Sequence, residues 1–344
     1  MMPAMGWYEA AIRPLLFGMP PEAAHRTAMA MLGLPLPLRR IAGPPPDPAL
    51  GIDLAGIPLA SPIGMAAGFD KTCRRLDALG ALGFGFVVGG TITRAPRRGN
   101  PRPRIVRDRA RGSMTNAMGL PNPGARAAAA AIARQVRTVP RLVSLADEAI
   151  DDALAALGWL EPHVDGLELN ASCPNVSWGR DRDQEAHLRE LLTALRARTA
   201  KPLFVKLPPF MSATEREVVV SLASIAEAAG ADGLVCANTR PVDDVRLSTG
   251  RGGMSGEALR DRTPAIVAEV RAVTDAPIVA CGGISAAADV VASLEAGATA
   301  VQVYTSFVYQ GPHLPGRLAR ELASELRGRG LTLQELVGSP SATG

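Results

Sequence analysis

The sequence lacks the cysteine spacings that build disulfide frameworks, zinc sites and iron–sulfur clusters. Its four cysteines, Cys73, Cys173, Cys236 and Cys281, lie far apart, and none belongs to a C-x-x-C pair. Zinc sites and iron–sulfur clusters usually draw on closely spaced cysteines, and a disulfide framework usually needs several cysteines in a short chain. We therefore expect no disulfide framework and no metal site, and a reducing cytosolic environment is the simplest fit.

The sequence also has no long apolar run and no strong excess of one charge. No apolar stretch reaches the about 18 residues of a bilayer-spanning helix, and the N-terminus lacks the apolar core and cleavage site of an export signal. The net charge is only +4, from 37 basic and 33 acidic residues. No basic run is interleaved with aromatic residues, so we expect no nucleic-acid partner.

What is present is ample apolar sequence, at 47% of 344 residues. From about residue 50 onward, short apolar runs alternate with helical segments, and glycine-rich phrases such as Ala229-Gly-Ala-Asp-Gly233 mark helix-to-strand turns. Eight such units predict an α/β fold, a (β/α)8 TIM barrel. An open doubly wound sheet is the alternative, but the strand count and the missing G-x-G-x-x-G opening weigh against it. The expected strands are 63–67, 84–89, 141–145, 166–170, 203–207, 233–237, 278–280 and 300–304; helices are expected at 185–198, 213–229, 262–273 and 286–296.

Residues 1–42 differ from the rest and predict a small N-terminal helical extension ahead of a barrel domain over residues 43–344. A short amphipathic helix is expected over residues 7–18, and a second one begins at the Pro20-Pro21-Glu22 signal. Such helices either cover one end of a barrel or lie on a membrane surface. The second helix places four residues on one face: His25, Ala28, Met29 and Leu32.

Polar side chains follow nearly every expected strand. The strand 166–170 ends in Asn170-Ala-Ser-Cys173-Pro-Asn175, the fifth ends in Lys206, and the sixth is followed by Asn238-Thr239. In a barrel, chemistry lies on the loops that follow the strands. Asparagine amides suit a planar amide or imide ring, and a cysteine can transfer a proton as thiol and thiolate. On spacing alone, a polar strand end with an inert buried cysteine remains the alternative.

Glycine and hydroxyl turns follow other strands. Small residues let a flat ring or a phosphate approach the backbone, and the turns after strands seven and eight stand where barrels commonly bind phosphate. Taken singly, a Gly-Gly turn is usually only a turn. Together these segments predict a phosphorylated cofactor and a small planar substrate rich in carbonyl and N–H groups. The segments are Ala66-Ala-Gly-Phe-Asp-Lys71, Gly89-Gly-Thr-Ile-Thr93, Gly252-Gly-Met-Ser-Gly256, Cys281-Gly-Gly-Ile-Ser285 and Tyr304-Thr-Ser306.

In combination the motifs resemble the dihydroorotate dehydrogenases, FMN-dependent barrels that oxidise dihydroorotate to orotate in pyrimidine biosynthesis. The resemblance runs from about residue 7 to 330. In that family the motif after the fourth strand is Asn-x-Ser-(Ser/Cys)-Pro-Asn, and its fourth residue removes the C5 proton while a hydride passes from C6 to the flavin. The resemblance therefore implies FMN as cofactor and Cys173 as catalytic base. A thiol becomes a base at mildly alkaline pH, since its reference pKa is about 8.5.

The same resemblance implies the other site residues. The pyrimidine would be held by Lys71, Asn116, Asn170, Asn175, Asn238 and Thr239. FMN would contact Ala67, Gly68, Lys71, Thr91, Asn170, Lys206, Ser255, Gly256, Gly282, Gly283, Tyr304 and Thr305. Within that set Lys206 would lie by the isoalloxazine ring and stabilise its anionic reduced form.

The chain combines features of two classes in this family. The N-terminal extension and Gly252–Gly256 resemble the membrane-associated, quinone-reducing class 2 enzymes, and His25, Arg107 and Tyr304 match residues that line the quinone tunnel there. The Cys173-Pro-Asn-Val176 loop resembles the soluble class 1 enzymes. The resemblance thus implies a class 1-like substrate side, a quinone as acceptor, and a peripheral position at the cytoplasmic face of the cell membrane.

Three alternatives stay open from sequence. The chain could use a soluble acceptor such as fumarate. It could be another FMN barrel with an active-site cysteine that acts on a dihydropyrimidine, such as a dihydropyrimidine dehydrogenase or a dihydrouridine synthase. It could also be a non-catalytic FMN-binding homologue, which the presence of the cysteine, both lysines and the amides disfavours.

Overall fold

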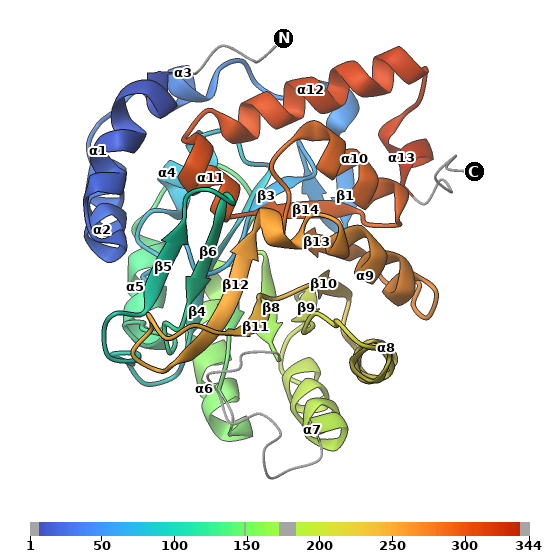
Figure 1. Cartoon of the computed structure of the whole chain (residues 1–344). Coiled ribbons are helices and arrows are strands. Elements are labelled where there is room, and N and C mark those ends of the chain that lie inside the picture. Colours follow the sequence, from blue (N-terminus) through green and yellow to red (C-terminus); the bar gives the residue numbers. More distant parts are fainter. Residues whose placement is uncertain (1–6, 148, 172–183, 338–344) are drawn as a thin grey trace.

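Eight parallel strands close into a barrel at the centre of the computed structural model, which describes residues 7–147, 149–171 and 184–337 (Figure 1). Each strand pairs with the next in chain order, and the last pairs with the first. Every strand coincides with one of the expected apolar runs, so the predicted barrel is confirmed. The strands are β3 (Ile63–Met65), β4 (Phe86–Ile92), β7 (Arg141–Leu145), β8 (Gly166–Asn170), β9 (Leu203–Lys206), β10 (Gly233–Cys236), β13 (Ile278–Cys281) and β14 (Ala300–Val303).

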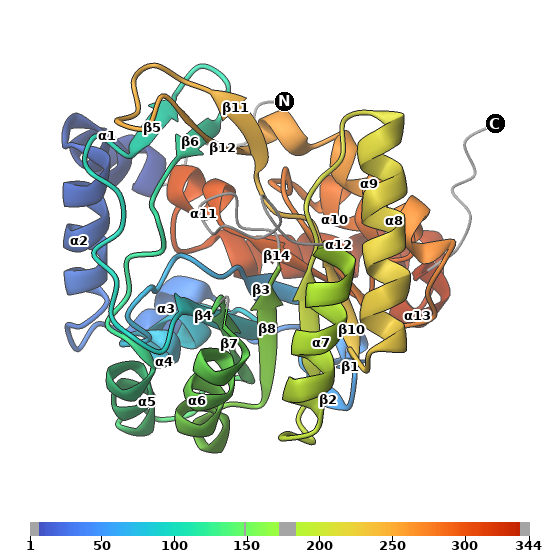
Figure 2. The same cartoon turned by 90° about the horizontal axis from the view of Figure 1, so that it is seen from below.

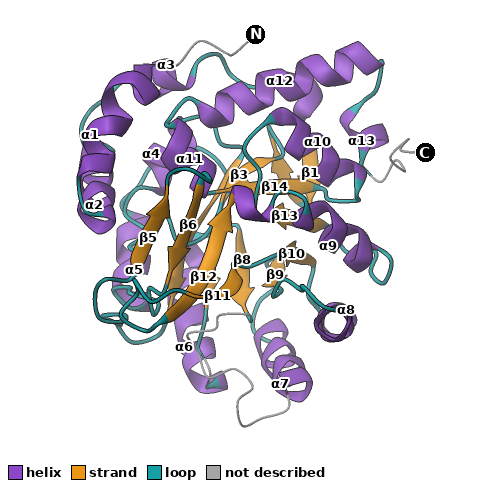
Figure 3. Cartoon of the chain, in the orientation of Figure 1, coloured by secondary structure: helices purple, strands orange, loops and turns teal. Residues whose placement is uncertain are grey.

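Helices surround the strands on the outside, as Figures 2 and 3 show. They bury an apolar stripe against the barrel: on α7, Leu188, Leu191, Leu192 and Leu195 are buried at helical spacing. The four helices expected from sequence agree with α7 to α10 to within two residues at each end. The outer helices are α4 (Leu76–Ala81), α5 (Ala125–Ala133), α6 (Ile150–Leu160), α7 (Gln184–Arg196), α8 (Ala213–Ala228), α9 (Arg262–Arg271), α10 (Ala287–Glu295) and α12 (Leu314–Arg329), with the shorter α11 (Thr305–Gln310) and α13 (Leu333–Leu336).

The amino end of the barrel is filled by large apolar side chains. Phe86 and Phe204 fit inside because facing positions are glycine: a Cβ on Gly64 would lie 2.3 Å from the Phe86 ring, and one on Gly233 would lie 2.5 Å from the Phe204 ring. The hairpin of β1 (Ile52–Leu54) and β2 (Ile57–Leu59) packs its leucines and isoleucine into the same cluster. This end is therefore solid, and a ligand can enter only from the other end.

At the carboxyl end, the segments after β4 and β10 form a four-stranded antiparallel sheet, where the sequence predicts loops. Its order is β11 (Arg240–Asp243), β12 (Arg251–Gly256), β6 (Ser113–Asn116) and β5 (Ile105–Asp108). Figure 1 shows β5, β6 and β12 side by side, between the N-terminal helices and β13. The sheet thus forms one wall above the open end of the barrel.

The N-terminal extension packs against this sheet and against α11. It consists of a π-helical turn (Tyr8–Ile12), α1 (Arg13–Gly18), α2 (Pro21–Met31) and α3 (Leu38–Ala42). The Tyr8 hydroxyl donates to the Val308 carbonyl at 2.8 Å, and Arg13 donates to the Tyr309 carbonyl at 3.1 Å. Among the described residues, no helix combines the length and apolarity needed to cross a membrane. The predicted domain division after residue 42 stays a prediction.

Candidate active site

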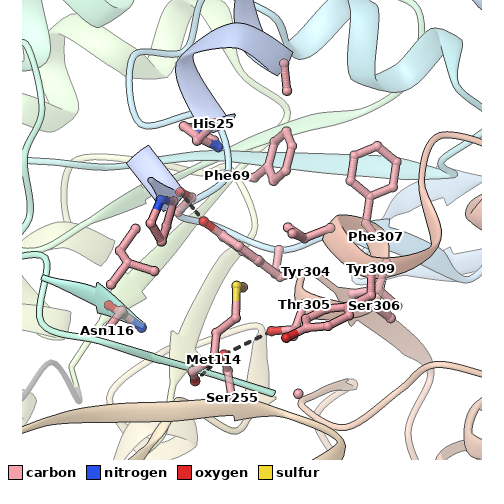
Figure 4. A pocket seen from close by; sticks show the side chains of 18 of the residues that line it. His25, Phe69, Met114, Asn116, Ser255, Tyr304, Thr305, Ser306, Phe307 and Tyr309 are labelled. Atoms are coloured by element: carbon pink, nitrogen blue, oxygen red, sulfur yellow. Dashed lines mark hydrogen bonds between the residues drawn. The ribbon is translucent and has the colours of Figure 1, made fainter. Parts of the chain in front are cut away.

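One cavity of about 1280 Å³ lies over the carboxyl ends of the barrel strands and continues beneath the N-terminal helices. Every predicted site residue that the structure describes lines it. Two predicted residues, the base Cys173 and the amide Asn175, lie outside the described residues. Figure 4 shows side chains from α2, the four-stranded sheet and α11 around this space. Side chains predicted from distant parts of the sequence are therefore brought together.

A row of amides and hydroxyls crosses the strand ends. The Asn170 side-chain amide donates to the Thr91 hydroxyl at 3.3 Å, and the Asn238 side-chain amide donates to Asn170 Oδ1 at 3.1 Å. The Thr91 and Ser144 hydroxyls are 3.1 Å apart. These residues come from β4, β7, β8 and the end of β10. Each side chain orients its neighbour, so the amides present fixed donors and acceptors to the cavity.

Beneath that row lies a buried charged cluster. The Lys206 ammonium is 3.7 Å from Glu168 Oε1 and 3.5 Å from Gln302 Oε1, and the Gln302 amide donates to Glu168 Oε2 at 3.1 Å. The Cys281 thiol lies within hydrogen-bonding reach of the same ammonium. Burial alone would lower the pKa of Lys206, but Cys281 and Glu168 outweigh it and raise that pKa. Burial raises the pKa of the Cys281 thiol although the Lys206 charge opposes that rise, so at pH 7 the thiol is neutral and the ion pair of Lys206 is the one with Glu168.

Sequence reading missed Glu168 and Gln302 as part of the site. Both interrupt runs that are otherwise buried and apolar, which is an informative position for a charged or amide side chain. Glu168 also precedes Asn170 by two residues, so both side chains point to the same face of β8. The spacing of two residues between Glu168 and Asn170 is therefore the sequence signal that indicates Glu168 as a site residue.

Two turns at the ends of β13 and β14 form a backbone cradle. Gly283 has φ +73°, and a Cβ there would lie 2.3 Å from the backbone nitrogen of Arg260. Within the described ranges, the N–H groups of Gly283 and Ile284 donate to no other group. Thr305 donates to the Ser255 hydroxyl at 2.9 Å, an interaction drawn in Figure 4. Free N–H groups beside glycines and hydroxyls suit an anion such as phosphate.

Aromatic rings connect the barrel mouth to α2. His25 meets Phe69 edge-on at a centroid distance of 5.1 Å, and Phe69 meets Tyr304 at 5.6 Å, an arrangement visible in Figure 4. The Tyr304 hydroxyl donates to the Gly68 carbonyl at 3.2 Å. Burial, with the nearby Lys71 charge, lowers the pKa of His25 to about 4. At neutral pH the imidazole is therefore uncharged and offers one donor and one acceptor.

Arginines fasten the N-terminal helices over the cavity. Arg107 stacks on the Phe17 ring at 4.5 Å and donates to the carbonyl of Leu16 at 3.2 Å and to that of Met19. The Glu22 carboxylate of α2 pairs with Arg102 at 2.5 Å and with Arg104. Arg107 thus lines the cavity and also caps the last carbonyls of α1.

A closed barrel with an open polar end, an anion cradle and a buried lysine defines a (β/α)8-barrel enzyme that works at the carboxyl ends of its strands. Residues 49–326 match the family model described as dihydroorotate dehydrogenase. The chain belongs to the dihydroorotate dehydrogenase family, as the sequence motifs predicted.

Proteins named dihydroorotate dehydrogenase (quinone) are similar to the chain over nearly its whole length. The one from Rhodospirillum rubrum is 38% identical, with 97% of this chain and 94% of the relative covered. The one from Acidithiobacillus ferrooxidans is also 38% identical, with 92% and 94% covered. A solved structure, the Eimeria tenella enzyme in complex with ferulenol, superposes with a TM-score of 0.81 at 29% identity, covering 94% of this chain and 98% of that one.

Proposed function

We propose that this chain oxidises dihydroorotate to orotate with bound FMN and passes the electrons to a quinone. The observation that carries the proposal is one continuous cavity, which joins the amide row at the strand ends to the space beneath α1 and α2. Two substrates can then reach the same cofactor from different directions. The relatives named as quinone-dependent dihydroorotate dehydrogenases support both the substrate and the acceptor.

The cavity residues fit FMN on their own chemistry. The turns at Gly282-Gly283 and Tyr304-Thr305 would hold the phosphate, and the N–H groups of Gly283 and Ile284, which have no acceptor among the described residues, would supply donors. Lys206 offers a buried cation to the ring, and the small residues leave room for its flat face. When bound, FMN supplies the hydride acceptor and the electron carrier. The other FMN contacts are proposed for Ala67, Gly68, Lys71, Thr91, Asn170, Lys206, Ser255 and Gly256.

The substrate would bind among the amides. The carbonyl and N–H groups of the pyrimidine match the paired donors and acceptors of asparagine. Lys71, whose ammonium donates to the Gly68 carbonyl, would stand near the substrate carboxylate. We assign Cys173 as the base that takes the C5 proton, and both Cys173 and Asn175 belong to the segment outside the described residues. The described substrate contacts are proposed for Lys71, Asn116, Asn170, Asn238 and Thr239.

The quinone would enter beneath the N-terminal helices and meet His25, Arg107 and Tyr304. His25 is neutral at pH 7, so its ring can hydrogen-bond a quinone oxygen without burying a charge. Exposed apolar side chains in the extension would support contact with a membrane surface, and we propose that the protein binds peripherally at the cytoplasmic face. These side chains are Trp7, Leu15, Met31, Leu34 and Leu36.

Anaerobic mixing tests the proposal most directly. The purified protein should carry FMN, and its flavin absorbance should bleach on addition of dihydroorotate. A short-chain ubiquinone should then restore the colour faster than fumarate does. A protein that takes up no FMN would contradict the cofactor assignment, and turnover with fumarate but not with quinone would contradict the acceptor.

A further inference from the structure

Glu168 is a buried carboxylate that none of the proposed cofactor or substrate contacts uses. Its side chain has no access to solvent. One oxygen accepts from Gln302, and the other has no hydrogen-bond partner among the described residues but faces the Lys206 ammonium. A buried carboxylate is costly unless a cation or donors compensate it. The cation that faces the Glu168 carboxylate is Lys206, on the neighbouring strand β9.

Lys206 needs an anion just as much, because burial favours the neutral amine. Glu168 approaches it from β8 and Cys281 from β13, while Cys236 on β10 lies beside Cys281. Burial raises the pKa of both thiols, that of Cys236 to about 12, so neither is an anion at pH 7. Asn170 on β8 and Gln302 on β14 do not ionise. Among the residues that the structure describes, Glu168 is therefore the group that can keep Lys206 charged.

We propose that Glu168 is a positioning residue of the cofactor site, which would hold Lys206 as an ammonium for the bound flavin and balance its charge. Gln302 fixes the carboxylate through its amide and turns its own oxygen toward the ammonium. The inference rests on the proposed function, since it takes FMN as the ligand above Lys206. Its consequence is that Lys206 stays charged across the working pH range of the enzyme.

The substitution Glu168→Gln should make the Lys206 charge depend on pH. Without the carboxylate, burial is no longer opposed and the pKa of Lys206 falls. Below that lowered pKa the ammonium has no counter-charge, so reduced anionic FMN is favoured more strongly than in wild type. Above it the amine is neutral and the preference is lost. Relative to wild type at the same pH, the preference for reduced over oxidised FMN should fall about tenfold or more between pH 6 and pH 9, because a nearby charge in a buried site contributes at least that much.

The measurement is the midpoint potential of bound FMN in each variant relative to wild type at the same pH, with FMN affinity followed by fluorescence quenching. The potential of Glu168→Gln should lie above that of wild type at low pH and below it at high pH. Glu168→Asp keeps a carboxylate, so its difference from wild type should stay level across the pH range. The matched control is Glu295→Gln, which removes the carboxylate paired with Arg329 at 2.6 Å on the outer surface and should change nothing.

If the midpoint potential of FMN in Glu168→Gln equals that in wild type at every pH, the inference is overturned, while FMN binding, and so the proposed function, stays intact. Wild type that binds no FMN would instead overturn the proposed function. Should Glu168→Gln not fold, the Glu168→Gln/Lys206→Met double variant decides, because it leaves no unpaired charge. We expect it to fold and to show a level profile with a preference for reduced FMN about tenfold below wild type. A double variant that also fails to fold would contradict the pairing.

Discussion

The two ends of the barrel use the same eight strands but carry opposite kinds of side chain. At the amino end Phe204, Val279 and Ala300 belong to the apolar cluster under the β1–β2 hairpin. Two residues further along those same strands stand Lys206, Cys281 and Gln302, which line the cavity. Side chains two residues apart on a strand point to the same face. Consecutive inward-pointing residues of these strands therefore belong first to the apolar core and then to the polar cavity.

This difference separates stability from chemistry along the barrel axis. The apolar end can be packed tightly because nothing needs to enter it, and its glycines make room for the phenylalanine rings. The polar end holds buried charges and amides that cost stability unless they meet each other or a ligand. Substitutions at the polar end should therefore mainly lower activity, and substitutions at the apolar end should mainly lower the free energy of unfolding.

The largest effect is expected for the base at the polar end. Cys173→Ala should retain FMN but bleach with dihydroorotate about 10²–10⁴-fold more slowly, since this is the usual contribution of a general base. Stopped-flow absorbance measures the rate. Cys236→Ala is the control, because that buried thiol packs among the outer apolar residues and is not part of the cavity lining. Bleaching of Cys173→Ala at the wild-type rate would refute the assignment of the base.

At the apolar end, Phe204→Ala should lower the free energy of unfolding by about 3–5 kcal/mol, the usual cost of removing a buried phenylalanine. Phe204 is 1% exposed and packs against Gly233 of the next strand. Urea unfolding followed by circular dichroism measures the loss, and Phe204→Leu should show a smaller one. The folded fraction should still bleach with dihydroorotate at the wild-type rate. A slowed bleaching rate without loss of stability would show that the two ends are not separable in this way.

Much of this contrast was predictable from sequence because barrel strands are continuous apolar runs between glycine turns. The runs at 141–145 and 166–170 agree with β7 and β8 at both ends. Residues placed after such runs had to meet at one end of the barrel, so the cavity lining followed from the fold. The inward side chains within the runs were harder to predict, because a fully buried run has no exposed face that shows which side lines the barrel. The signal for Glu168 and Gln302 is their spacing of two residues from the strand-end residues Asn170 and Tyr304.

The four-stranded sheet was missed for a different reason. β11 contains Pro241, and β12 contains Gly252 and Gly253, residue types that are depleted in strands. Gly253 is needed because a Cβ there would lie 2.0 Å from the Thr239 hydroxyl. β12 finds its partner β6 far away in the sequence, at Gly253 opposite Asn116. Only the closed barrel brings these segments together, so local propensity could not reveal them.

The N-terminal helices cover part of the cavity at the polar end. Removing them separates the reduction of the flavin by dihydroorotate from its reoxidation by quinone. Deleting residues 1–34 should leave bleaching by dihydroorotate largely intact but slow reoxidation by a short-chain ubiquinone about 10²-fold, because the acceptor loses the residues that would position it. Both half-reactions can be followed in the same stopped-flow samples, so the first serves as the control for folding. Equal reoxidation rates in the two proteins would argue against a quinone path beneath these helices.

The smallest expected effect is a pH dependence that arises where the extension meets the barrel. His25 has a pKa of about 4 in the folded protein, lowered by burial and by Lys71, against about 6.5 when unfolded. Below pH 6.5 the unfolded chain therefore binds a proton that the folded protein does not. The stability from the neutral imidazole is fully present above pH 6.5 and is lost as the pH falls toward 4. Between pH 7 and pH 5 the loss should be about 1–2 kcal/mol.

The measurement compares urea unfolding of wild type and His25→Gln from pH 7 to pH 5, since glutamine keeps a polar group without the titration. The difference between the two proteins isolates His25 from other groups, including Asp147, whose pKa burial raises to about 6. Asp147 acts in the opposite direction, because a carboxyl with a raised pKa adds stability as the pH falls. Parallel curves for the two proteins would mean that the imidazole is hydrated or charged in the folded state. A neutral hydrogen-bonding role beside a quinone would then lose its physical basis.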